Sequence, residues 1–147
     1  MKHCIYCGYM LGSTKEHIIP RALLSDLRLH THRNIEPPEH NIAPCCEICN
    51  CTKASRVILP TPGHLTDIYV NTPALYLRGL AEWITFNKND LRDFFEKEGN
   101  RQFYGVELYE IDTVVTLYWK DYYEKLNDQT RNIPNNAFNR QDLIKQK

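Results

Sequence analysis

Apolar residues in the second half of the chain recur at the three- and four-residue intervals expected of helices that bury one face. The clearest such face follows Pro73 and contains Leu77, Leu80, Ala81 and Ile84. Thr72 can cap this helix, with Pro73 as its first residue, because a proline at that position gives up no hydrogen bond. The pattern therefore predicts a helix that begins at residue 73.

Two further helices are predicted beyond it. Asn89 can cap a short helix that ends near Gly99 and carries the apolar side chains of Leu91, Phe94 and Phe95. Helical spacing then continues from Leu108 to Leu126, over roughly five turns. The β-branched run at residues 114–116 makes a β-strand an alternative for part of that segment.

The first sixty residues are rich in motifs and poor in long periodic segments. Proline and glycine gather at residues 60–63, which is typical of a loop between two parts of a chain. We therefore predict an α+β protein of 147 residues, with a small module at residues 1–60 and a mainly helical extension at residues 61–147.

Charge and hydropathy narrow the function classes. The chain has 18 basic and 18 acidic residues and a formal net charge of zero. This balance argues against tight, non-specific binding to DNA, which depends on Lys and Arg neutralising phosphates. No apolar run is long enough to span a membrane, and the N-terminus lacks the apolar stretch of a signal peptide. We expect a cytoplasmic protein with no membrane partner, whose cysteines remain reduced.

The six cysteines include two Cys-x-x-Cys pairs, Cys4/Cys7 and Cys46/Cys49. Two such pairs can supply the four thiolates that a structural zinc ion prefers. A single pair would leave redox-active or unpaired thiols as an alternative, but two pairs favour zinc. Cys45 and Cys51 flank the second pair and either could substitute as a ligand, although we interpret both as small buried side chains.

Two polar stretches lie between and beside these pairs. The first is Glu16-His17-Ile-Ile-Pro20, and the second runs from Asn41 through the second cysteine pair to Asn50 and Lys53. In this combination the chain resembles the HNH endonuclease family over residues 4 to about 56. The resemblance implies a ββα-metal fold, in which a β-hairpin and a helix hold a catalytic cation beside a structural zinc ion.

The resemblance also implies a role for each residue. Glu16 and Asn50 would hold a catalytic Mg²⁺ or Mn²⁺, which binds oxygen ligands. His17 would act as the general base that activates water, a task suited to an imidazole near neutral pH. Asn41 would orient the hairpin and the segment around His17. Lys53 and Arg21 are candidate phosphate contacts.

The expected function is metal-dependent hydrolysis of DNA phosphodiester bonds. Small proteins of this family occur in phage-defence and mobile-element systems, so a partner such as an ATPase, or self-association through the helical extension, is an expectation by analogy. One alternative is a non-catalytic zinc-binding adaptor of the same fold, and another is a ribonuclease.

Overall fold

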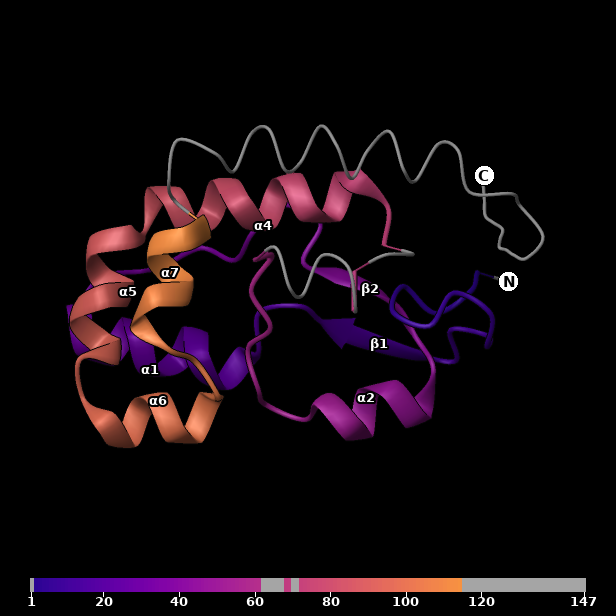
Figure 1. Ribbon diagram of the computed structural model, residues 1–147, viewed down its shortest axis with the longest axis horizontal. Coiled ribbons are helices and arrows are strands. Elements are labelled where there is room, and N and C mark those ends of the chain that lie inside the picture. The colour runs from indigo at the N-terminus through magenta and orange to yellow at the C-terminus, as the bar shows by residue number, and fades with distance from the viewer. Residues whose placement is uncertain (1, 62–67, 70–71, 115–147) are drawn as a thin grey trace.

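The computed structural model describes residues 2–61, 68–69 and 72–114, and it confirms an α+β fold (Figure 1). The described elements, in chain order, are β1 (Thr14–His17), α1 (Arg21–Thr31), β2 (Ile42–Cys45), α2 (Glu47–Lys53), α4 (Ala74–Phe86), α5 (Lys88–Phe95), α6 (Glu98–Tyr104) and α7 (Leu108–Val114). No helix within these ranges has the length and apolarity needed to cross a bilayer.

The two strands form an antiparallel sheet, in which Glu16 lies opposite Ala43 and His17 opposite Ile42. Side chains alternate across a strand, so neighbouring residues point to opposite faces. Glu16 and Ala43 are buried, whereas Lys15 is exposed and His17 is half-buried. Helix α2 follows β2 directly and packs on β1. Helix α1 lies between the two strands in the chain, so the order is β1, α1, β2, α2; we call the paired strands β1 and β2 the hairpin.

The helix predicted from residue 73 is α4, but its start differs from the prediction. Pro73 is the residue before the helix rather than its first residue, and Thr72 makes no capping bond. The hydroxyl of Thr72 instead donates to the carbonyl of Ile5 at 2.8 Å. The threonine therefore ties the beginning of α4 to the N-terminal loop, a contact between distant residues that local sequence rules do not encode.

The short helix predicted from Asn89 to Gly99 is also wrong in its bounds. Asn89 lies inside α5, and Gly99 lies inside a separate helix, α6. Between the two, Lys97 adopts an extended conformation, with ψ at 126°. The side chain of Asn100 donates to the carbonyl of Phe94 at 2.8 Å and so satisfies a carbonyl at the end of α5.

The last predicted helix corresponds to α7 as far as residue 114. Residue 114 is helical, which contradicts a strand at that position. The remainder of the prediction, residues 115–126, lies outside the described residues.

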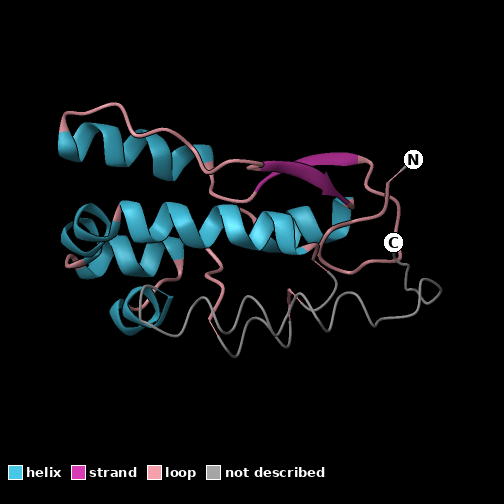
Figure 2. Ribbon diagram, turned by 90° about the horizontal axis from the view of Figure 1, so that it is seen from above, coloured by secondary structure: helices cyan, strands magenta, loops and turns pink. Residues whose placement is uncertain are grey.

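Contacts cross the predicted boundary at residue 60. The Tyr104 hydroxyl of α6 donates to Asp26 of α1 at 2.5 Å, and α1 packs on α5. Trp83 of α4 donates its indole N–H to the carbonyl of Glu36 at 2.6 Å. Figure 2 shows the hairpin and α1 along one side of the molecule with the later helices beside them. The buried apolar residues accordingly form one core drawn from both parts of the chain.

Candidate active site and metal centre

Four cysteines converge beside the hairpin. The sulfur atoms of Cys4, Cys7, Cys46 and Cys49 all lie within 4.8 Å of one another. Four sulfurs around one zinc ion, each about 2.3 Å from the metal, would be about 3.8 Å apart. The cluster can therefore hold a metal ion after a small contraction, and its donor set of four thiols fits zinc.

Backbone N–H groups donate hydrogen bonds to two of these sulfurs. The N–H of Tyr6 donates to the Cys4 sulfur at 3.4 Å, and the N–H of Cys49 donates to the Cys46 sulfur at 3.4 Å. Burial acts to raise the pKa of the Cys4 thiol, but backbone hydrogen bonds from Cys46, Cys7 and Tyr6 bring it below its ordinary value. Burial raises the pKa of the Cys7 and Cys49 thiols. Thiolate is the form that binds metal, so binding of an ion must release protons from the cluster.

The two other cysteines differ from each other. Cys45 is fully buried, as expected, and its sulfur lies 3.9 Å from that of Cys4. Burial raises the pKa of the Cys45 thiol, which donates to the carbonyl of Cys46 at 3.4 Å. Cys51 is exposed on α2, so the prediction that it is buried is wrong. Neither belongs to the four-sulfur cluster.

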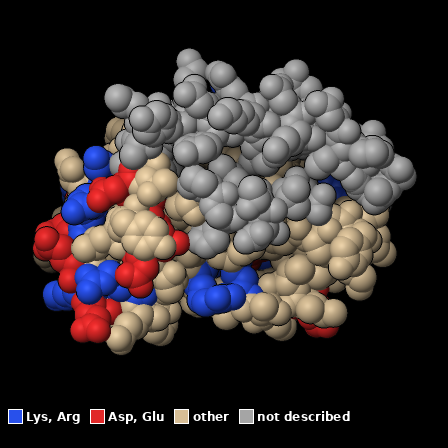
Figure 3. Space-filling view, in the orientation of Figure 1, with Lys and Arg blue, Asp and Glu red and all other residues tan. Residues whose placement is uncertain are grey.

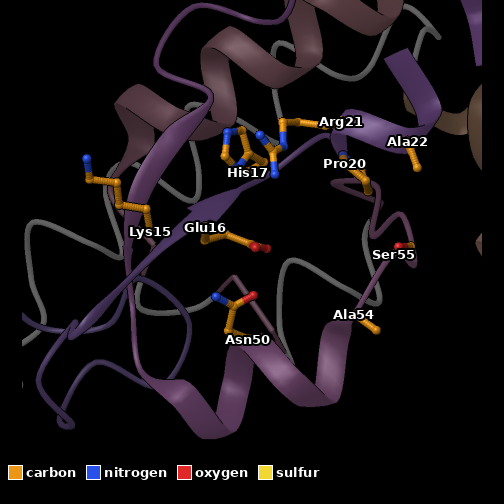
Figure 4. Close-up of a pocket in the computed structure, with 9 residues that line it drawn as sticks. All are labelled: Lys15, Glu16, His17, Pro20, Arg21, Ala22, Asn50, Ala54 and Ser55. Atoms are coloured by element: carbon orange, nitrogen blue, oxygen red, sulfur yellow. The ribbon is translucent and has the colours of Figure 1, made fainter. Parts of the chain in front are cut away.

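A pocket of about 270 Å³ opens next to the hairpin (Figure 4). It is formed where β1, the beginning of α1 and the end of α2 meet. The residues that line it are Lys15, Glu16, His17, Pro20, Arg21, Ala22, Asn50, Ala54 and Ser55. Four residues assigned a role from the sequence, Glu16, His17, Arg21 and Asn50, thus share one pocket.

The carboxylate of Glu16 is the most constrained group of the pocket. Its side chain is 4% exposed, and both of its recorded partners bind the same oxygen, Oε2. The Tyr6 hydroxyl donates to this oxygen at 2.7 Å, and the Lys53 ammonium lies 2.8 Å from it. Within the described residues Oε1 makes no such contact, and Glu16 lines the pocket, so this oxygen can accept a ligand there.

Asn50 approaches the same space from α2. Its amide nitrogen donates to the Thr14 hydroxyl at 2.9 Å, which in turn donates to the carbonyl of Cys45 at 2.6 Å. This chain of bonds fixes which atom of the amide is the nitrogen and which is the oxygen. In Figure 4 the side chains of Glu16 and Asn50 face each other across the gap between β1 and α2.

His17 leaves β1 on the side opposite Glu16, next to Arg21 (Figure 4). Asn41 holds the segment that follows: its amide oxygen accepts from the Ile19 N–H at 2.8 Å, and its amide nitrogen donates to the Ile19 carbonyl at 3.2 Å. The Ile18 N–H also donates to the backbone carbonyl of Asn41 at 2.9 Å. These three bonds clamp the chain directly after His17.

The cations of the site fall into two groups. Lys15 and Arg21 are exposed and line the pocket, so they can meet an anion from solvent. Lys53 is only 3% exposed and lies outside the pocket lining, with its ammonium on Glu16 and 3.4 Å from the His17 carbonyl. The expected phosphate contact of Lys53 does not fit this burial. Its position makes it a partner of the carboxylate.

Sequence reasoning missed Tyr6, Thr14, Lys15 and Ser55. Lys15 and Ser55 are sequence neighbours of residues already chosen, so proximity to Glu16 and Lys53 could have indicated them. Tyr6 carries no such signal, because its contact with Glu16 depends on how the turn between Cys4 and Cys7 folds back onto β1.

No family model, no curated protein and no solved structure matches the chain in comparisons with each of these groups.

Proposed function

We propose that this protein is an HNH-type nuclease that hydrolyses phosphodiester bonds of DNA with the help of a divalent cation. The observation that carries the proposal is that Glu16, His17, Asn50 and Arg21 all line one pocket between β1, α1 and α2. Glu16 and Asn50, which are 34 positions apart in the sequence, both line this pocket.

Zinc is proposed as the structural ion of the four-cysteine cluster. Cys46 is the residue that precedes α2, and Cys4 lies in the loop before β1. An ion bound to both would tie the beginning of α2 to the loop before β1. In small modules of this kind, the free energy of metal binding is also folding free energy.

The donors in the pocket fit a hard cation such as Mg²⁺ or Mn²⁺. Glu16 offers one carboxylate oxygen and Asn50 an amide oxygen, and Mg²⁺ sites commonly combine one or two carboxylates with water and substrate phosphates. When bound, the cation stabilises negative charge on the phosphate and on the leaving oxygen. Because Lys53 neutralises part of the Glu16 charge, we expect affinity for the free cation to be modest.

The remaining residues have separate tasks in this proposal. His17 accepts the proton of the attacking water, and Asn41 keeps the segment behind His17 in place through its bonds to Ile19. Arg21 and Lys15 bind the phosphate from the rim of the pocket. The pocket lining holds these two cations and a single carboxylate, already paired with Lys53, so its charge favours an anion.

The charge distribution bears on how DNA is delivered. On the face seen in Figure 3, acidic and basic side chains intermingle over the α5 and α6 end, a small basic patch lies beside it, and the rest of the described surface in this view is mostly uncharged. A chain of zero net charge gains little from counterion release on DNA. We therefore propose that a partner protein, or a second copy, contributes to DNA binding.

The direct test is to incubate the purified zinc-bound protein with plasmid DNA, single-stranded DNA and RNA in Mg²⁺, Mn²⁺ or EDTA. The proposal predicts cleavage of DNA with either cation and none in EDTA. Cleavage of RNA alone would assign a ribonuclease. Tight binding of a partner protein without cleavage of any nucleic acid, even with that partner added, would favour a zinc-binding adaptor.

A further inference from the structure

We infer that Tyr6 is a positioning residue, which holds Oε2 of Glu16 so that Oε1 is presented to a divalent cation in the pocket. The inference rests on the proposed function, because it takes Glu16 to be a cation ligand. It adds a residue from the zinc-binding turn to the catalytic site.

The first step in the argument is that both partners of the carboxylate bind one oxygen. The hydroxyl of Tyr6 and the ammonium of Lys53 lie 2.7 and 2.8 Å from Oε2. The carboxylate cannot rotate to exchange its oxygens without breaking both contacts. Hydrogen bonds to an ionised group are stronger than those between neutral groups, so this restraint is substantial.

The second step concerns Tyr6 itself, which is 8% exposed and joins two sites. Its backbone N–H donates to the Cys4 sulfur at 3.4 Å, and its hydroxyl donates to Glu16. The ring is further held by Tyr69, with ring centroids 6.1 Å apart. Because its backbone, ring and hydroxyl are all held in place, Tyr6 can keep the carboxylate at a fixed position relative to the metal-binding turn.

The third step is the contrast between the two donors. The positive charge of Lys53 competes with a cation for the carboxylate, whereas the neutral hydroxyl of Tyr6 orients the carboxylate without adding charge. Removing the Tyr6 hydroxyl should free the carboxylate to turn toward Lys53 alone. A cation would then have to reorder the carboxylate on binding, and its affinity would fall.

The chain offers a matched control in Tyr104. This tyrosine is 1% exposed and donates its hydroxyl to a carboxylate, that of Asp26, at 2.5 Å, and neither residue lines the pocket. Tyr6→Phe removes a buried hydroxyl–carboxylate bond and Tyr104→Phe a half-buried one. Both variants lose one hydroxyl–carboxylate bond, and only the first concerns the carboxylate of the pocket.

The experiment is a Mn²⁺ titration of the ¹⁵N-labelled, zinc-bound protein, followed by paramagnetic broadening of the amide signals of Glu16 and Asn50. We expect the Mn²⁺ dissociation constant to rise about ten-fold in Tyr6→Phe, the effect of losing one hydrogen bond to an ionised group. It should stay within about two-fold in Tyr104→Phe. Zinc content should equal that of the wild type in both variants.

Cleavage assays supply a second readout. In Tyr6→Phe the Mn²⁺ concentration for half-maximal cleavage should rise by the same factor, and the rate at saturating Mn²⁺ should recover. Wild-type affinity or tighter binding in Tyr6→Phe would overturn the inference, as would the absence of local broadening in the wild type. Weakened binding in Tyr6→Phe, in a protein that cleaves nothing, would support the inference and reject the proposed nuclease function.

Discussion

We predict that the buried ion pair between Glu16 and Lys53 contributes strongly to the free energy of unfolding. Their charged atoms lie 2.8 Å apart, and the two side chains are 4% and 3% exposed. Removing one partner of such a pair leaves an uncompensated charge in the interior, which typically costs about 3–5 kcal/mol. Domains of this size are commonly stable by about 5–15 kcal/mol, so either Glu16→Ala or Lys53→Met should consume a large share of the folding free energy.

The coupling between the two residues can be separated from other effects by a double-mutant cycle. Glu16→Gln and Lys53→Met are each expected to destabilise strongly, whereas the double variant removes both charges and keeps an amide oxygen that Tyr6 can reach. We expect its cost to be smaller than the sum of the single costs by about 2–3 kcal/mol. The measurement is urea unfolding of the zinc-bound proteins, followed by circular dichroism.

A matched control is the pair between Arg92 and Asp112, whose atoms lie 2.5 Å apart and whose side chains are 38% and 50% exposed. Solvent screens such a pair, so its coupling should be below about 1 kcal/mol. If the coupling between Glu16 and Lys53 were no larger than this, the interpretation of a dry, paired carboxylate would be refuted. A large coupling would also mean that any loss of activity in Glu16→Ala has two causes, the unfolding of the protein and the loss of the cation ligand.

Two further predictions concern the metal cluster and the packing of α4. Cys4→Ser should lose zinc and unfold the N-terminal part, while Cys45→Ser should retain zinc. If elemental analysis found zinc in Cys4→Ser and none in Cys45→Ser, Cys45 rather than Cys4 would be the ligand. Gly79→Ala should destabilise the protein by about 1–3 kcal/mol, because a Cβ there would lie 2.5 Å from the carbonyl oxygen of Glu39. Ala81→Gly in the same helix should also destabilise the protein, because glycine has a lower helix propensity than alanine. Unchanged thermal stability in Gly79→Ala would contradict the close approach of α4 to the loop at Glu39.

Much of the site could be predicted because its signals are local. The spacing of the two cysteine pairs is enough to predict the cluster, since each pair forms one turn around an ion. The alternation of a strand likewise separates Glu16 from His17, one buried and one half-buried. The α+β class followed from the contrast between a short motif-rich region and a longer periodic one.

The rest depends on contacts between distant residues. Lys53 looks like a surface cation in the sequence, but the fold places its ammonium on the carboxylate of Glu16. Thr72 has the features of a helix cap, yet its hydroxyl bonds Ile5, 67 residues away. Propensity rules describe the contacts that a residue can make with its sequence neighbours. They do not predict a stronger hydrogen-bond or ion-pair partner on a distant element.

In the proposed function His17 activates water for hydrolysis, and a comparison of cleavage rates tests this role. The rates of plasmid cleavage by the zinc-bound wild type and by His17→Ala should be measured in Mg²⁺ and in Mn²⁺. His30→Gln serves as a control, because His30 lies near the far end of α1 and pairs with Asp93 at 2.6 Å. The account predicts that His17→Ala keeps its zinc and its fold but loses about two to four powers of ten in rate, while His30→Gln cleaves like the wild type. Equal cleavage by the wild type and His17→Ala would contradict the account.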